Sequence, residues 1–356
     1  MKRATTVGEL GEQPLDDATG APAASAAVPA PSLARNLLGW FDSWAVQIDP
    51  TVDQRAPDWS RVVPFAILHL SCLLVIWVGW SPVAVAVAVG FYLVRMFAIT
   101  GFYHRYFSHR AFKTSRPVQF VFACIGGMAV QRGPLWWASH HRDHHRYSDE
   151  ERDVHSPVQN SFYWSHVGWI VCRENYHTKI DNIRDFARFP ELRFLDRFDV
   201  LVPLLTLAGM LGLGWALEVF APSLGTNAMQ MGVWGFSIST VVLYHGTFSI
   251  NSLAHRIGKR VFPTADDSRN NFLLSLITLG EGWHNNHHHY QSSARQGFRW
   301  WEIDITYYGL CLLERIGLVS DLRPVPARVA TERISDPDAP GARFDKSAVT
   351  RGRAAR

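Results

Sequence analysis

Long apolar runs with very few charged residues are the dominant pattern along this chain. Residues 62–80 and 82–103 form one pair of such runs, with only Arg95 charged inside them, and 200–220 and 229–250 form a second pair. A helix of about 20 apolar residues spans the hydrocarbon core of a bilayer, whereas core helices of soluble proteins rarely stay uncharged for so long. The pattern predicts an all-α integral membrane protein with four transmembrane helices in two hairpins.

Basic residues are distributed unevenly around these runs. The turns inside the two hairpins, near residues 80–82 and at 221–228, contain no Lys or Arg, whereas the other segments hold nearly all of the 35 basic residues. Basic loops remain on the cytoplasmic side of a membrane. We therefore expect a multi-pass protein of the cell inner membrane, with both termini and a helical cap built from 104–199 and the carboxyl-terminal third in the cytoplasm.

The two ends of the chain differ in composition from the rest. Residues 1–34 are rich in Ala, Pro and Ser without an apolar run typical of a signal peptide, and 322–356 are polar and rich in Arg. Such composition favours disordered tails, which leaves 35–321 as the folded domain. The four cysteines stand far apart without a C-x-x-C pair, which argues against a thiolate metal site or a disulfide framework. We expect no nucleic-acid partner.

Histidines provide the strongest chemical signal. All but one of the 16 lie at or after His104, and many fall into short groups. The motifs H-x-x-H-H at 141–145 and 284–288 place their histidines at i, i+3 and i+4, which share one helix face, so each is expected to point three nitrogens at a common point. Asn251 and His255 stand at i and i+4. The candidate metal ligands are His104, His109, His141, His144, His145, His255, His284, His287 and His288.

Nine imidazoles exceed the needs of one metal ion, since a catalytic zinc usually takes three protein ligands. The sequence therefore predicts a two-metal site, although imidazole suits iron, copper, zinc and nickel alike. Soluble di-iron proteins use Glu-x-x-His pairs, and two such pairs occur here, Glu174–His177 and Glu281–His284. That alternative is disfavoured because it leaves the 141–145 motif without a role.

Taken in order, five segments resemble those of the membrane fatty acyl desaturases of the stearoyl-CoA, delta-nine type. They read GFYHRYFSHRAFK, WWASHHRDHHRYSDEERDVHSP, SHVGWI, NSLAH and GEGWHNNHHHY, and the resemblance covers roughly residues 61–304. It implies four transmembrane helices below a helical cytosolic cap, and two ferrous ions held by the nine histidines, with Asn251 reaching one through water. It also implies an oxygen-dependent enzyme that introduces a cis double bond into a saturated acyl chain, with acyl-CoA as the expected substrate.

Substrate contacts are expected at fewer positions. The resemblance places Trp169 along the acyl tunnel, His166 is expected to face the substrate, and Ala88 and Tyr92 are candidates for the tunnel floor. Where the stearoyl-CoA enzymes carry an arginine for coenzyme A just before the second histidine motif, this chain has Ser139. Four basic residues are candidates to compensate for the missing arginine: Arg142, Arg146, Arg173 and Lys179. A substrate whose acyl group is attached to a lipid or a carrier protein stays open as an alternative.

A saturated chain offers no acid, leaving group or polarised carbonyl, so its desaturation requires a metal centre that activates O₂. No haem, flavin or nicotinamide domain is visible, and electrons are therefore expected from ferredoxin or cytochrome b5. A di-iron hydroxylase with the same ligands is the closest alternative, and only the product separates the two. A metal transporter is disfavoured because it needs ligands inside the spans.

Overall fold

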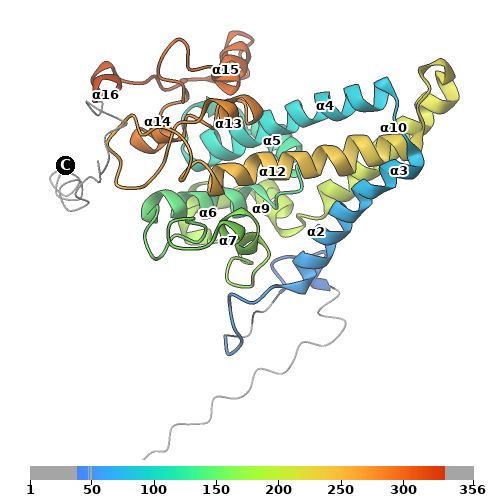
Figure 1. Cartoon of the computed structure of the whole chain (residues 1–356), viewed down its shortest axis with the longest axis horizontal. Coiled ribbons are helices and arrows are strands. Elements are labelled where there is room, and N and C mark those ends of the chain that lie inside the picture. The colour runs from blue at the N-terminus through green and yellow to red at the C-terminus, as the bar shows by residue number, and fades with distance from the viewer. Residues whose placement is uncertain (1–37, 47, 49, 333–356) are drawn as a thin grey trace, which may run out of the picture.

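The computed structural model describes residues 38–46, 48 and 50–332, and this part of the chain is mainly helical, with long loops between the helices (Figure 1). The predicted arms at 1–34 and 333–356 lie outside the described residues. Residues 322–332, which we expected to belong to the carboxyl-terminal tail, fold back on the protein instead. They contain helix α16 (Ala327–Thr331), and Val329 is buried. Backbone hydrogen bonds join Arg323 to Ala111 and Ala294, which explains why this polar segment is ordered.

Three helices within the described residues are long and apolar enough to cross a membrane: Trp59–Val78, Pro82–Ser108 and Leu201–Phe220. The first comprises α2 (Trp59–Ser71), η1 (Cys72–Leu74) and α3 (Val75–Val78). The second comprises α4 (Pro82–Phe97) and the π-helical segment η2 (Ala98–Ser108), and the third is α10 (Leu201–Phe220). The chain is therefore a helical membrane protein, as predicted.

A tight turn joins the first two spans for clear local reasons. Gly79 has a φ of 66°, in the left-handed region that glycine adopts without steric cost, and so ends α3. The side chain of Ser81 then accepts a hydrogen bond from the backbone of Ala84 at 3.1 Å, and Pro82 occupies the first turn of α4. The end of α3 at Gly79 and the capped beginning of α4 explain the antiparallel hairpin.

The fourth predicted span, 229–250, forms a continuous helical segment but is more polar and more deeply buried than the other three. It consists of α11 (Ala228–Gln230), the π-helical η6 (Met231–Ile238) and α12 (Ser239–Ser252), and it packs on both α4 and α10. Its polar side chains meet the buried Arg95 of α4, which donates to Ser239 Oγ at 2.6 Å and Thr240 Oγ1 at 2.7 Å. These bonds account for hydroxyl groups within an otherwise apolar segment.

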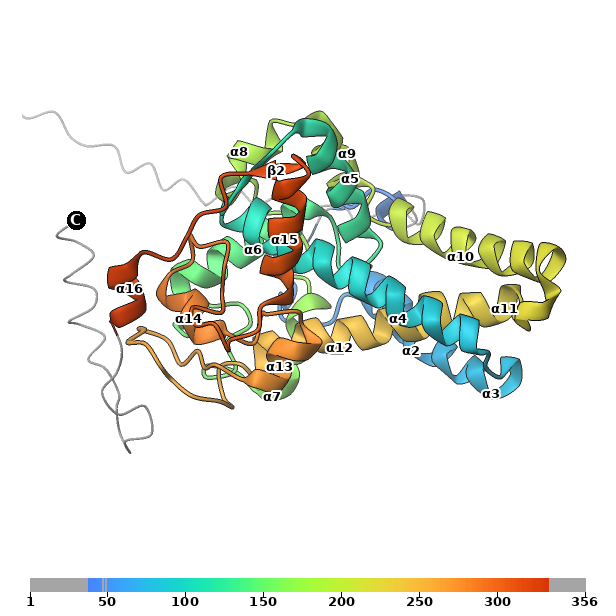
Figure 2. The same cartoon turned by 90° about the horizontal axis from the view of Figure 1, so that it is seen from above.

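Most of the remaining elements form a cap at one end of the spans (Figure 2). The amphipathic stretch 118–137 is divided between α5 and α6. The elements of the cap and loops are α5 (Arg116–Gly127), α6 (Pro134–Tyr147), α7 (Phe162–His166), η3 (Gly168–Ile170), η4 (Ile180–Asn182), α8 (Arg184–Ala187), α9 (Pro190–Arg197), η5 (Pro222–Leu224), α13 (Phe272–Ile277), α14 (His284–His289), α15 (Ile305–Arg315), and the antiparallel pair β1 (Lys113–Thr114) and β2 (Val319–Ser320).

Buried aromatic rings and one buried cation join the cap to the spans. Phe102 of η2 stacks on Phe122 of α5 with ring centroids 3.8 Å apart. The guanidinium of Arg105, also in η2, donates to both carboxylate oxygens of Asp304 at 2.9 and 3.0 Å and to Glu281 at 3.1 Å. Because a buried charge is tolerated only when it is paired and hydrogen-bonded, this network fixes η2 against the segments around α13 and α15.

We predict that Gly214→Ala lowers the melting temperature of the detergent-solubilised protein. An added Cβ would lie 2.5 Å from the carbonyl oxygen of Asn227 and 2.6 Å from Cα of Ala228, so α10 and α11 must separate. Overpacking of this kind costs about 1–3 kcal/mol, or several degrees. Gly212 of the same helix has nothing within 4 Å of the added Cβ. Gly212→Ala should therefore melt no lower than the wild type, and equal melting of both variants would contradict the packing described.

Candidate metal centre

The structure brings all nine predicted histidines together in two adjacent groups. The nitrogens within each group lie within 4.8 Å of one another. Most of these histidines are buried at the junction of η2, α6, α14 and the end of α12. The first group contains His104, His109, His141, His145 and His287, and the second contains His144, His255, His284 and His288.

Each H-x-x-H-H motif is shared between the two groups, so our expectation that its three nitrogens meet at one point is wrong. On α6, His141 and His145 join the first group and His144 the second; on α14, the pair at 284 and 288 joins the second and His287 the first. With 3.6 residues per turn, positions i and i+4 lie about 40° apart, whereas i+3 and i+4 lie about 100° apart. A single motif of this kind therefore contributes histidines to both groups.

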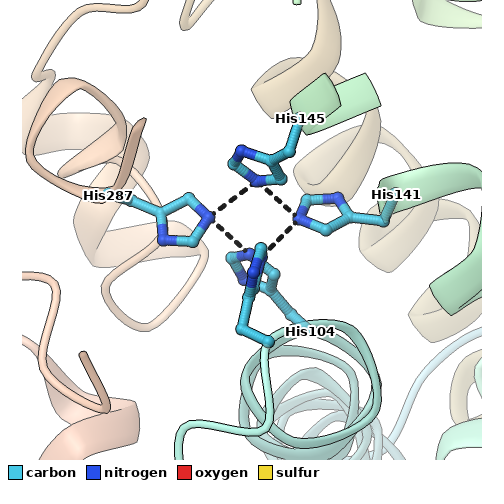
Figure 3. A group of neighbouring side chains, drawn as sticks. His104, His141, His145 and His287 are labelled. Carbon is cyan, nitrogen blue, oxygen red and sulfur yellow. Dashed lines mark hydrogen bonds between the residues drawn. The ribbon is translucent and has the colours of Figure 1, made fainter. Parts of the chain in front are cut away.

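The Nε2 atoms of the first group approach one another closely (Figure 3). The distance is 2.9 Å from His104 to His287, from His287 to His145 and from His145 to His141. Nitrogens about 2.1 Å from one metal ion lie about 3.0 Å apart at right angles and about 3.4 Å apart in a tetrahedron. The spacing therefore suits an ion with more than four ligands. In the second group, His255 Nε2 lies 2.9 Å from His284 Nε2.

Carboxylates behind the histidines fix the direction of these nitrogens. In the second group, Nδ1 of His144, His255 and His288 donates to Asp153, Asp149 and Asp266 at 2.9, 2.8 and 2.8 Å. A ring that donates from Nδ1 in its neutral form presents a lone pair at Nε2, and such partners orient metal-binding histidines.

In the first group, Nδ1 of His104 contacts Glu281. We considered this glutamate as a direct ligand, but it belongs to neither group because it lies behind His104 and binds Arg105. Glu174 and His177 also lie outside both groups. Sequence reasoning missed the three aspartates, although Asp149 and Asp153 lie within the conspicuous segment that follows the 141–145 motif.

Burial keeps most of these rings uncharged. It lowers the pKa of His109, His141, His145, His284 and His287 well below 6.5. At His255 burial acts in the same direction, but the Asp149 carboxylate outweighs it and raises the pKa to about 9. Neutral imidazole is the form that binds metals.

The donor set fits a pair of metal ions. Nε2 of the buried His288 has no hydrogen-bond partner among the described residues, and a cation would satisfy it. The two groups are close, since the rings of His145 and His288 lie 4.4 Å apart between centroids. The residues around both groups therefore favour two ions over nine independent histidines.

An apolar cavity of about 620 Å³ reaches the histidines. Its wall includes His141, Asn251 and Trp169, so the cavity joins the predicted tunnel residue Trp169 to the surroundings of the histidines. Asn251 also lines a second cavity of about 40 Å³ beside His104 and His284. The volume of the larger cavity is in the range of small-molecule sites.

The other predicted substrate residues lie away from the lining of both cavities. His166 donates or accepts at Ser252 Oγ and at His245 Nδ1, both at 2.9 Å, on the outside of α7 and α12. The carbonyl of Ala88 accepts from Ser239, and the hydroxyl of Tyr92 donates to the carbonyl of Ile277. Arg142 is bound by Asp185, and the exposed Arg146 contacts Asn182.

Comparison with known proteins gives matches over most of the chain. Residues 78–308 match the family model described as fatty acid desaturase. The chain is 39% identical over 274 residues to delta-9 acyl-lipid desaturase 1 of Arabidopsis thaliana, covering 74% of this chain and 85% of that protein. It is 35% identical over 284 residues to the sn-2 palmitoyl-lipid 9-desaturase of Nostoc sp. (strain 36), covering 77% and 93%. It is also 34% identical over 271 residues to the icosanoyl-CoA 5-desaturase of Limnanthes douglasii, covering 75% and 72%.

We predict that Asp266→Asn lowers the metal affinity of the second group by about 10- to 100-fold, because it removes the charge that raises the basicity of His288. Competition with a chromogenic chelator, together with metal analysis per chain, measures the change. Asp267 provides the matched control, since its side chain is 39% exposed and pairs with Arg260 at 3.2 Å. Equal metal affinity in Asp266→Asn and Asp267→Asn would show that the carboxylate behind His288 has no such role.

The metal-free protein should lose stability as the pH falls below about 6.5. The five histidines with lowered pKa stay neutral in the folded state but take up protons when unfolded, so the unfolded state binds more protons below that pH. His255 opposes this trend, because its contribution is full below about 6.5 and is lost as the pH rises through about 9. Melting curves of chelator-treated protein between pH 5.5 and 7.5 test the prediction, and a flat profile would refute it.

Proposed function

The chain belongs to the fatty acid desaturase family, and from this premise we propose that it is an O₂-dependent oxidoreductase that introduces a cis double bond at the ninth carbon of a saturated fatty acyl chain. The observation that carries the proposal is the position of nine histidine nitrogens in two groups at one end of an apolar cavity. In the reaction, two hydrogens leave neighbouring methylenes, and with two electrons and two protons they reduce one O₂ to two waters.

We propose that the two histidine groups hold two ferrous ions, with Asn251 reaching one of them through water. The bound metal would supply the O₂ activation that an unactivated C–H bond requires. The residues of the chain hold the ions in place, orient the acyl chain and exclude water. Burial of His104, His144, His284 and His287 keeps bulk water from this space.

The cavity wall next to the histidines is fixed by hydrogen bonds. Gln131 Nε2 donates to Thr247 Oγ1 at 3.0 Å, and Trp137 Nε1 donates to Gln131 Oε1 at 3.3 Å. Trp137 also stacks on His141 with ring centroids 5.0 Å apart. Each buried methylene contributes about 0.8 kcal/mol to substrate binding. We propose that this rigid wall determines which carbon pair lies beside the metals.

The topology and setting of the enzyme follow from the same proposal. We propose that Ala228–Ser252 is the fourth span, so that two hairpins cross the inner membrane and both termini lie in the cytoplasm. The desaturase domain then begins near residue 35 and extends past residue 321 to include α16. Electrons would come from a separate ferredoxin or cytochrome b5, and the basic composition of the chain favours an acidic donor.

Expression in a host that lacks its own desaturase tests the function. We expect monounsaturated C16 and C18 chains from the wild type, detected by gas chromatography with mass spectrometry. His287→Ala and His144→Ala should abolish the product and reduce the metal content while the protein still inserts into the membrane. His177→Ala is the control, since His177 lies outside both groups. A product that carries only hydroxyl groups would identify a hydroxylase instead.

A further inference from the structure

We infer that the acyl chain reaches this site as part of a membrane phospholipid, which enters the cavity sideways between α2 and α10 and places its phosphate at Arg61 and Arg132. The inference rests on the proposed desaturase function and specifies its substrate class. It replaces acyl-CoA, which the sequence resemblance favoured, because of three features of the cavity and its surroundings.

The first feature is the opening of the cavity toward lipid. Residues of α2, α10 and η6 contribute to its wall, and two of the apolar side chains there are largely exposed. Ile67 of α2 is 59% exposed and Leu204 of α10 is 48% exposed. A side chain that both lines a cavity and faces outward lies at an opening. Since α2 and α10 belong to helices apolar enough to span a membrane, that opening faces the bilayer.

The second feature is a cluster of two guanidinium groups and one carboxylate in the same cavity wall. Arg132 Nε lies 2.6 Å from Asp199 Oδ2, and Arg61 Nη1 lies 3.5 Å from the same oxygen. The guanidinium groups of Arg61 and Arg132 lie over the ring of Tyr176, 4.4 and 5.0 Å from its centroid. Asp58 caps α2 through Ser60 and is not part of the wall. The lining therefore carries one positive charge more than Asp199 neutralises.

One nitrogen of this cluster lacks a partner. Arg132 Nη2 donates to the carbonyl of Tyr176 at 2.9 Å, whereas Nη1 is buried without a hydrogen bond among the described residues. The side chain of Arg132 is 8% exposed. Leaving a charged donor buried and unpaired is costly, and an anionic oxygen in the cavity would satisfy it. Arginine binds phosphate oxygens with two parallel hydrogen bonds.

The cluster lies at the level expected for a phospholipid headgroup. Arg61 stands in the first turn of α2, two residues before the exposed apolar Val63, and Asp199 lies two residues before α10, where Leu201 is exposed. Basic side chains at the ends of apolar spans lie among the headgroups. A phospholipid bound here would keep one acyl chain in the bilayer while the other follows the cavity wall to Thr247 and Asn251 beside the histidines.

The third feature is that two of the cations proposed to bind coenzyme A are already used. Arg142 forms two bonds with Asp185, at 2.8 and 3.0 Å, and donates to the carbonyls of Phe107 and Ser108. Lys179 contacts Asp143 at 2.5 Å. These groups fix the cap rather than face a ligand. Arg146 and Arg173 remain as the matched controls for coenzyme A binding.

A pulse of ¹³C-labelled stearate in cells that express the enzyme distinguishes the two carriers. Mass spectrometry of the phospholipid and acyl-CoA pools measures where the labelled double bonds appear. We expect them first in intact phospholipids. Arg132→Gln should slow their appearance about tenfold, the loss expected from removing charged hydrogen bonds, with the metal content per chain unchanged. Arg146→Gln and Arg173→Gln should behave as the wild type. Arg61→Gln, at a less buried side chain, provides a second variant if Arg132→Gln accumulates poorly.

Several outcomes would overturn the inference without touching the proposed function. Labelled double bonds that appear first in the acyl-CoA pool, together with slow turnover in Arg146→Gln or Arg173→Gln, would identify acyl-CoA as the substrate. Equal rates of double-bond formation in Arg132→Gln, Arg61→Gln and the wild type would show that this cluster binds no phosphate. By contrast, labelled stearate that stays saturated in every pool would reject the desaturase function itself.

Discussion

The structure depends on the convergence of imidazole nitrogens in a buried space. Several Nε2 atoms lie about 2.9 Å apart, and the carboxylates behind His104, His144, His255 and His288 hold those rings in place. Nitrogens held this close together form a preorganised site for a cation. Metal binding is therefore expected to contribute directly to the stability of the folded protein.

The elements around the histidines serve this constraint. The π-helical η2 carries both His104 and Arg105. Glu281 contacts His104 and also accepts from Arg105, so two adjacent residues of η2 hold this carboxylate in place. Helices α6 and α14 each contribute to both groups, so two helices fix the positions of the groups relative to each other. The wall of the cavity begins beside these histidines, at Trp137 and Asn251.

The sequence predicted which histidines gather at this site better than how they are arranged. Apolar length and histidine spacing were enough for the helical membrane class and for all nine members of the two groups, because both signals are local. The division of each motif between two groups was missed, since it depends on how α6 and α14 face one another. Asp266 and the cluster of Arg61, Arg132 and Asp199 were missed because their partners are distant in sequence. The sequence also could not show which helices line the cavity. Ala88 and Tyr92 belong to α4, whereas residues of α2, α10 and η6 contribute to the wall of the larger cavity.

The two histidine groups differ in their electrostatic surroundings, and this difference follows from the carboxylates. The carboxylate behind the first group, Glu281, shares the guanidinium of Arg105 with Asp304, so its charge is compensated in part. The three aspartates behind the second group are bound by histidines, by backbone amides and, at Asp149, by the hydroxyl of Ser156. None of these donors carries a permanent charge. The potential at the second group is therefore more negative, and in a site of low dielectric constant such a difference is weakly screened. We expect this charge to favour a cation at the second group and to offset the fifth nitrogen that only the first group has.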